Sequence, residues 1–278
     1  ISDYRAIMKE FGTMEDFDRL LQECHKKELK VIMDMVLNHT STEHPWFKAA
    51  ISSPDSAYRD YYIIRKGKEE KGKLLPPTNW ASTFTGSAWE RIEGTDDFYL
   101  HLFCKEQADL NWENPEVRYA LYEAAKFWLE KGVGGFRIDA ITYIKKPAEF
   151  LDGRADGKEG TVNIHIMTAN QPGILDFLRE FKAKVFAGHD IFTVGEANGV
   201  KPEELSDWVG SNGVFDMFHV GQLNIIHEAK KRCDYLIVGV YADDVVESYK
   251  HHRPVIGEND RQKIVAAIKD VDEAFVSH

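Results

Sequence analysis

The sequence predicts an α/β fold with a parallel β-sheet, and a repeated order of elements carries that prediction. Apolar runs at residues 31–37, 135–140 and 191–196 each follow a segment with helical spacing of apolar residues. A helix followed closely by a strand is typical of α/β proteins. Each run also ends in a carboxylate or a polar cluster, and parallel α/β sheets build their active sites at the carboxyl ends of the strands.

The elements of this first unit have recognisable start signals. Thr13 is expected to cap the first helix, with Asp16 three residues later as a loose capping box. Pro115 and Pro172 each open a later helix, because proline is favoured in the first helical turn. Residues 40–112 are rich in aromatic residues, prolines and small polar residues, which indicates an irregular insertion with short strands.

A second unit begins after about residue 212. Apolar runs at 235–240 and 274–276 read as strands, and residues 259–270 have the pattern of a helix between them. We therefore divide the chain into residues 1–212 and a separate α/β unit, residues 213–278.

Composition limits the classes of function. Of the 278 residues, 43% are hydrophobic, which allows a sizeable core, and the net charge of −11 argues against a nucleic-acid-binding surface spread over the chain. No apolar run reaches the roughly 18 residues of a membrane span, and the start lacks a signal-peptide pattern. The three cysteines are too far apart for a disulfide framework or a zinc site. We expect a cytoplasmic protein with no nucleic-acid, membrane or metal partner.

Two carboxylates at predicted strand ends suggest glycosidic chemistry. Asp139 and Glu196 could face each other across a sugar, one attacking the anomeric carbon and the other protonating the leaving oxygen. Arg137 precedes Asp139 by two residues, so both side chains point to the same face of the strand. A guanidinium there is expected to keep a nearby carboxylate ionised.

The end of the first strand adds candidate binding residues. Asp34, Asn38 and His39 could bind sugar hydroxyls through paired hydrogen bonds. The alternative is that a strand-end aspartate caps a helix or is simply solvated, which is the more common role of a lone one. Three ordered clusters of this composition favour a site, but the residues by themselves leave both interpretations open.

Several motifs carry a resemblance to a known family. Residues 34–39 (DMVLNH), 135–139 (GFRID), 194–196 (VGE) and 107–115 (QADLNWENP) resemble signature regions of the α-amylase superfamily, the family 13 glycoside hydrolases. The subgroup they resemble holds oligo-1,6-glucosidases and α-glucosidases. The resemblance covers residues 1 to about 212, although the family usually has proline where Ala108 stands.

This resemblance implies both a fold and an activity. The fold would be a (β/α)8 (TIM) barrel with residues 40–112 as an inserted B domain. The activity would be hydrolysis of α-glucosidic bonds in small oligosaccharides with retention and without a cofactor. Asp139 would be the nucleophile, Glu196 the general acid/base and Arg137 the residue that orients Asp139. His39 would bind the sugar in the first subsite.

Relative to that family, the barrel is expected to be incomplete. The match starts after the family's second strand, and the fourth signature, which supplies a third carboxylate, has no counterpart here. A full barrel needs roughly 250 residues without insertions. We therefore expect exposed sheet edges, which favour oligomers, and weak or no activity of this chain.

The second unit carries a different resemblance. Residues 213–278 resemble the N-terminal half of a glycerol-3-phosphate-type cytidylyltransferase, which implies a partial Rossmann-like unit. His219 would then meet the phosphates of CTP, bound with Mg²⁺, and Lys250 would neutralise them, while Gln222 replaces the second histidine of a His-x-Gly-His turn. This leaves two alternatives to the glycosidase: a CTP-dependent nucleotidyltransferase, and a non-catalytic hybrid or remnant.

Overall fold

The computed structural model describes residues 1–84, 86–156, 160–201, 204–208, 230–231, 233–245 and 258–277. They belong to two compact units, Ile1–Pro202 and Glu203–His278. The boundary expected between residues 212 and 213 falls outside the described residues.

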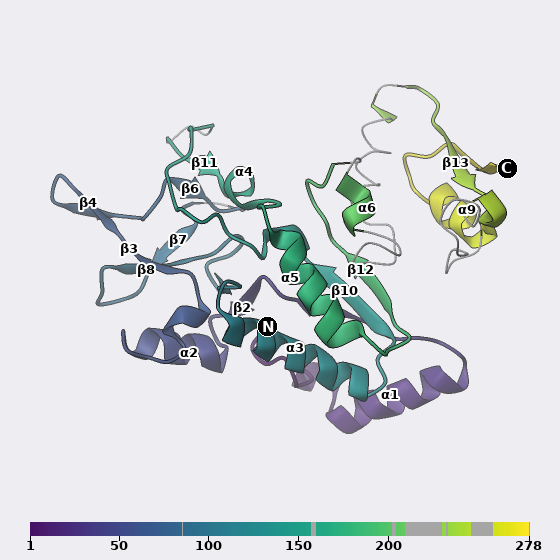
Figure 1. The fold of residues 1–278 in the computed structure, drawn as a ribbon, viewed down its shortest axis with the longest axis horizontal. Coiled ribbons are helices and arrows are strands. Elements are labelled where there is room, and N and C mark those ends of the chain that lie inside the picture. Colours follow the sequence, from purple (N-terminus) through teal and green to yellow (C-terminus); the bar gives the residue numbers. More distant parts are fainter. Residues whose placement is uncertain are drawn as a thin grey trace. The chain divides into compact units, whose positions relative to one another are not determined.

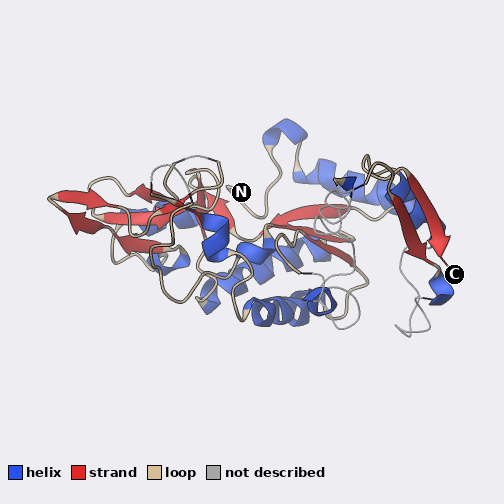
Figure 2. Cartoon of the chain, turned by 90° about the horizontal axis from the view of Figure 1, so that it is seen from above, coloured by secondary structure: helices blue, strands red, loops and turns tan. Residues whose placement is uncertain are grey.

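A three-stranded parallel sheet lies at the centre of the first unit. Its strand order is β1 (Ile32–Val36), β10 (Gly135–Asp139) and β12 (Phe192–Gly195). Figures 1 and 2 show the helices that precede these strands lying along one side of the sheet. They are α1 (Met14–Lys26), α3 (Pro115–Glu130) and α5 (Ile174–Phe181). The predicted alternation of helix and parallel strand is confirmed.

Local sequence explains where these helices begin. The Thr13 side chain accepts a hydrogen bond from the Asp16 amide, and the Asp16 carboxylate accepts one from the Thr13 amide at 2.9 Å, so the predicted capping box is formed. Pro115 stands in the first turn of α3, and the Asn114 side chain accepts a hydrogen bond from the Glu116 amide. A short π-helical turn, Lys182–Phe186, continues α5.

The first strand and the insertion are joined by an antiparallel pair. β2 (His39–Ser41) pairs with β9 (Gln107–Asp109), so the insertion starts and ends at the carboxyl end of β1. Between them lie α2 (Pro45–Ser52), the sheet β3–β8–β7 (Ile64–Lys66, Asp97–Leu100, Trp89–Arg91), the hairpin β4–β5 (Lys68–Glu70, Lys73–Leu75) and β6 (Trp80–Ala81). The shorter helical turns of the unit are Lys9–Phe11, Arg59–Tyr61 and Ile141–Tyr143.

The insertion packs against the segment that follows β10. β6 pairs with β11 (Val162–Asn163), which leads into α4 (Ile164–Thr168). Trp80, Trp89 and Leu100 of the insertion share one buried cluster with Ala140 and Tyr143. The insertion therefore packs over the carboxyl end of β10. Side chains from the insertion and from the segment after β10 lie close together there.

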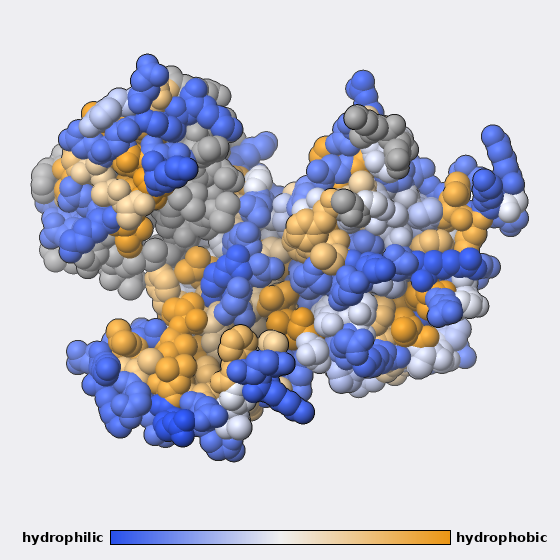
Figure 3. All heavy atoms as spheres, turned by 180° about the vertical axis from the view of Figure 1, so that it is seen from behind, coloured by the Kyte–Doolittle hydropathy of each residue, from blue (hydrophilic) through white to orange (hydrophobic). Residues whose placement is uncertain are grey.

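Part of the first unit's surface is apolar. Figure 3 shows apolar side chains gathered around α1 on the face opposite that of Figure 1.

Within the described residues, β1 and β12 each have one neighbouring strand. No helix of the described residues combines the length and the apolar character that crossing a bilayer requires.

The described part of the second unit contains a parallel strand pair. β13 (Ile237–Tyr241) pairs with β14 (Glu273–Ser277), and α9 (Glu258–Ala266), which lies between them in sequence, packs against both. Val240, Val265 and Val271 form its small core. The two strands and the helix predicted here are confirmed. A short helix, α6, spans Leu205–Trp208.

Candidate active site

Strand register brings the predicted carboxylates together. Asp34 of β1 lies opposite Arg137 of β10, and Arg137 lies opposite Val194 of β12. The Glu196 amide, just beyond β12, donates to the Ile138 carbonyl at 2.9 Å. Asp139 and Glu196 therefore lie side by side at the carboxyl end of the sheet, as the spacing predicted.

Arg137 is the centre of this cluster. Its Nη1 donates to both carboxylate oxygens of Asp34 at 2.9 and 2.8 Å, and to Asp139 Oδ1 at 2.7 Å. Its Nη2 donates to Glu196 Oε2 at 2.7 Å. One guanidinium thus holds three carboxylates, and its planar fork fixes their directions as well as their distances.

The pKa of the Asp139 carboxyl differs in direction from the expectation based on Arg137 alone. Burial is the largest influence and raises the pKa of the Asp139 carboxyl above its ordinary value, and the neighbouring Glu196 acts in the same direction, while Arg137 opposes both. The guanidinium therefore offsets only part of the cost of burial. The nearby charge of Arg137 is visible in the sequence, whereas the withdrawal of Asp139 from water is not.

The backbone after Asp139 is unusual. Ala140 adopts a left-handed conformation, with φ 48° and ψ 33°, although it carries a Cβ. Its amide donates to Glu196 Oε2 at 3.3 Å. A non-glycine residue held in this region costs of order 1 kcal/mol or more and persists where surrounding contacts demand it. Here the turn aims a backbone donor at the second carboxylate.

A pocket of about 180 Å³ opens onto the two carboxylates. Of the predicted site residues, it is lined by His39, Asp139 and Glu196. Its other lining residues were not assigned from sequence, and they are Phe84, Phe103, Gln107, Ala140, Tyr143, His165 and Asn198. Ala140, Tyr143 and Asn198 follow Asp139 or Glu196 within four residues. The others come from the insertion or from α4, so no local spacing connects them to the strand ends.

His39 lies deep in this pocket. Its Nε2 is 2.8 Å from Gln107 Nε2, and its ring meets the Phe103 ring edge-on at 5.5 Å between centroids. Burial lowers the pKa of the His39 imidazole, and the carboxylates of Asp109 and Asp139 oppose this shift. His39 is therefore presented to the pocket as a buried ring of lowered basicity.

Asn38 and Asp34 lie elsewhere than expected. Asn38 is fully buried, accepts a hydrogen bond from Lys146 Nζ at 2.8 Å and donates to Asp109 Oδ1 at 3.1 Å. The expectation that Asn38 binds a sugar hydroxyl is corrected, because its amide is already engaged and out of contact with the pocket. Asp34 does not line the pocket either, and its carboxylate is engaged with Arg137.

A buried ion pair lies beneath the site and was missed by sequence reasoning. Lys146 Nζ is 2.9 Å from Asp109 Oδ2, with side chains 4% and 0% exposed. Lys146 Nζ also donates to the Tyr143 carbonyl at 2.5 Å. Lysine is rarely buried, so its type gave no signal of this position.

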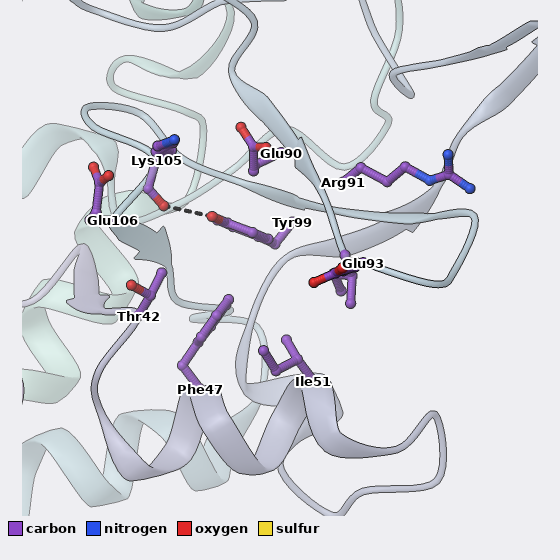
Figure 4. A pocket seen from close by; sticks show the side chains of 10 residues that line it. Thr42, Phe47, Ile51, Glu90, Arg91, Glu93, Tyr99, Lys105 and Glu106 are labelled. Atoms are coloured by element: carbon purple, nitrogen blue, oxygen red, sulfur yellow. Dashed lines mark hydrogen bonds between the residues drawn. The ribbon is translucent and has the colours of Figure 1, made fainter.

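The remaining candidates and a second pocket lie apart from these carboxylates. His219, Gln222 and Lys250 fall outside the described residues. Among the residues that are described, no cluster of three His, Cys, Asp or Glu side chains is arranged to hold a metal ion. Figure 4 shows the second pocket, of about 290 Å³, in the insertion, where the Tyr99 hydroxyl donates to the Lys105 carbonyl at 2.7 Å. None of the predicted site residues lines it.

Comparison with protein families decides the ancestry of the chain. Residues 1–272 match the family described as alpha amylase, catalytic domain. The chain belongs to the alpha-amylase family. Membership of this family implies a TIM barrel, and the three parallel strands are part of such a sheet. Because the match runs to residue 272, the comparisons give no support to a cytidylyltransferase segment from residue 213 onward.

Individual relatives of this alpha-amylase family chain are similar over part of their length. An oligo-1,6-glucosidase of Parageobacillus thermoglucosidasius is 52% identical over 204 residues, which are 73% of this chain and 36% of the relative. A trehalose-6-phosphate hydrolase of Bacillus subtilis (strain 168) is 51% identical over 197 residues, 70% of this chain and 33% of the relative. The chain thus spans about a third of the length of these curated relatives.

Two solved structures are similar to most of this chain. The crystal structure of Bacillus licheniformis trehalose-6-phosphate hydrolase matches this chain with a TM-score of 0.68 and 36% sequence identity. The match covers 99% of this chain and 54% of the hydrolase chain. The crystal structure of the trehalulose synthase from Pseudomonas mesoacidophila MX-45 matches with a TM-score of 0.72 and 38% identity. This match covers 82% of this chain and 40% of the synthase chain.

Proposed function

We propose that this chain supplies the nucleophile and the general acid/base of a retaining glycosidase that cleaves α-glucosidic bonds. The observation that carries the proposal is the pair Asp139 and Glu196, both bonded to Arg137 and both lining one pocket. Two carboxylates close enough to share one guanidinium suit retention, in which the carboxyl groups lie nearer together than in inverting enzymes.

In the proposed mechanism Asp139 attacks the anomeric carbon while Glu196 protonates the leaving oxygen. A covalent glycosyl intermediate forms on Asp139, and Glu196 then removes a proton from the water that hydrolyses it. Arg137 is assigned to positioning, because its two terminal nitrogens hold the two carboxylates at fixed directions. The raised pKa of Asp139 makes it a more basic, and hence more reactive, carboxylate once it is ionised.

His39 is proposed to bind the sugar held between the carboxylates, because it lines their pocket. Asp34 is assigned to orienting Arg137, and Asn38 to the buried network behind His39. The relatives named oligo-1,6-glucosidase and trehalose-6-phosphate hydrolase support a small α-glucoside as substrate. The partner expected for this site is accordingly a small oligosaccharide.

Hydrolysis of 4-nitrophenyl α-glucoside and of maltose by purified protein tests this proposal. Asp139→Asn is expected to abolish release from both substrates. Glu196→Gln is expected to reduce maltose cleavage more than aryl release, because nitrophenolate leaves without protonation. Asp190→Asn, at an exposed carboxylate, is the matched control. Measurable activity that is equal in wild type and Asp139→Asn would contradict the proposal.

The nucleotidyltransferase alternative rests on the sequence after residue 212. A parallel strand pair joined through a helix occurs in many folds and does not favour this chemistry over others. A thermal shift with CTP and Mg²⁺, compared between wild type and Gln222→His, tests it. A non-catalytic remnant would bind maltose without turnover, and Asp139→Asn would leave that binding intact.

A further inference from the structure

Both ring nitrogens of His39 face side-chain amide groups. Gln107 Nε2 lies 2.8 Å from His39 Nε2, and Asn38 Nδ2 lies 3.4 Å from His39 Nδ1. Which atom of each amide faces the ring decides which protonation state of the imidazole is compatible with this pocket, because an amide nitrogen donates and an amide oxygen accepts.

The direction of the Gln107 amide is fixed by its other contact. Gln107 Oε1 accepts a hydrogen bond from the Cys104 amide at 3.1 Å, and a backbone N–H can only donate. Turning the side-chain amide over would set two donors against each other at Cys104. The Gln107 NH₂ group therefore faces His39, so His39 Nε2 accepts, and in the neutral ring the proton is on Nδ1.

Asn38 faces the other side of the ring, also with its NH₂ group. Its oxygen accepts from Lys146 Nζ at 2.8 Å, which fixes the amide, and its nitrogen donates to Asp109 Oδ1 at 3.1 Å. An imidazolium carries N–H groups on both nitrogens. A charged His39 would thus meet a donor on each side.

We propose that Gln107 is a positioning residue that holds His39 as a neutral imidazole with its proton on Nδ1. The closer amide sets the tautomer, since its 2.8 Å contact is a full hydrogen bond whereas the 3.4 Å contact to Asn38 is at the limit of one. The use of His39 on a sugar rests on the proposed function, but the protonation state of the ring does not.

A neutral His39 suits the chemistry proposed for this pocket. The transition state of glycoside hydrolysis resembles an oxocarbenium ion, so positive charge develops at the anomeric carbon beside Asp139. An imidazolium on the same pocket wall would oppose that charge. A neutral ring lines the pocket without adding a positive charge beside the anomeric carbon.

The charges around His39 do not by themselves settle its state. The carboxylates of Asp109 and Asp139 favour protonation, whereas the Ile1 ammonium and Lys146 oppose it, and burial opposes it most strongly. These charges partly cancel. Replacing the Gln107 NH₂ donor at Nε2 by an acceptor should therefore change the protonation state of His39.

Nitrogen NMR of the imidazoles, on protein with ¹⁵N-labelled histidine and without substrate, tests the proposal. His39→Asn identifies the His39 signals. The wild type is expected to show a bare Nε2 and a protonated Nδ1, with a titration midpoint below that of an ordinary histidine. Gln107→Glu replaces the donor by a carboxylate of the same shape and is expected to raise the His39 midpoint by about 1–3 pH units.

Gln22→Glu adds the same charge on an exposed face of α1 and is expected to leave His39 unchanged. A proton on Nε2 in the wild type, or equal midpoints in Gln107→Glu and Gln22→Glu, would overturn the inference. In an active preparation, the acid limb of kcat/KM should also move to higher pH in Gln107→Glu. Absence of glycosidase activity would count against the proposed function alone, because the ring signals are read without turnover.

Discussion

Lys146 and Asp109 form an ion pair that is almost wholly withdrawn from water, with 2.9 Å between Nζ and Oδ2. Lys146 follows β10 and Asp109 ends β9, so this pair ties the insertion to the strand that bears Asp139. Burial lowers the pKa of the Lys146 ammonium, and Asp109 opposes that shift. Burying such a pair costs desolvation free energy, but removing one partner leaves the other charge buried and uncompensated.

Lys146→Met is therefore expected to destabilise the first unit by about 3–5 kcal/mol. Urea unfolding followed by tryptophan fluorescence measures this, because most tryptophans belong to that unit. Lys126→Met, which removes a partly exposed pair with Glu123, should cost about 0.5 kcal/mol or less. The double variant with Asp109→Asn should recover part of the loss, and a Lys146→Met protein as stable as Lys126→Met would argue against this account.

Arg137→Lys tests whether the guanidinium fork positions the two carboxylates. A lysine keeps the positive charge but cannot bond Asp139 and Glu196 from two rigidly spaced nitrogens. We expect kcat to fall about 100-fold or more, with a smaller change in KM. Arg19→Lys, at an exposed i,i+3 pair with Asp16, is the control. Full activity in Arg137→Lys would show that charge alone is sufficient.

Gly135→Ala tests the close approach between β10 and β12. Gly135 has φ 149°, and a Cβ there would lie 1.8 Å from the Phe192 carbonyl oxygen. That atom belongs to the backbone of the paired strand, so the strands must separate, and we expect a loss above about 4 kcal/mol or failure to fold. Gly94→Ala, with φ 75° and open space around it, should cost only about 1–2 kcal/mol. Thermal unfolding of the two variants compares them directly.

The raised pKa of Asp139 predicts a pH dependence of stability. The folded protein binds a proton on Asp139 more tightly than the unfolded chain, whose aspartates have a pKa of about 3.9. This contribution is greatest below that value and is lost as pH rises through the folded pKa. Asp139→Asn should therefore raise the melting temperature at pH 7, with a gain that shrinks toward pH 4. A variant less stable than wild type at pH 7 would contradict the raised pKa of Asp139.

The sheet and its carboxylates could be predicted from the sequence because their signals are local. Helical spacing followed by an apolar run gave the three parallel strands, and the side-chain period of two placed Arg137 beside Asp139. Glu196 follows from the same rule, because equivalent ends of parallel strands meet at one edge. These statements need only the order of residues within each segment.

The walls of the pocket could not be predicted in this way. Gln107 and Phe103 reach it through the pairing of β9 with β2, which joins residues far apart in sequence. The burial of Asn38 depends on Lys146, and nothing near Lys146 in sequence indicates that its ammonium is withdrawn from water. Side chains whose position depends on such long-range contacts have no local pattern to reveal them.

The central claim, that Asp139 attacks the sugar while Glu196 serves as acid/base, is tested most directly by trapping the intermediate. Purified protein incubated with 5-fluoro-α-glucosyl fluoride should gain the mass of one fluoroglucosyl group, and peptide mass spectrometry should place it on Asp139. Asp139→Asn should gain no mass, whereas Asp190→Asn should be labelled like wild type. A label on another residue, or equal labelling of wild type and Asp139→Asn, would contradict the account.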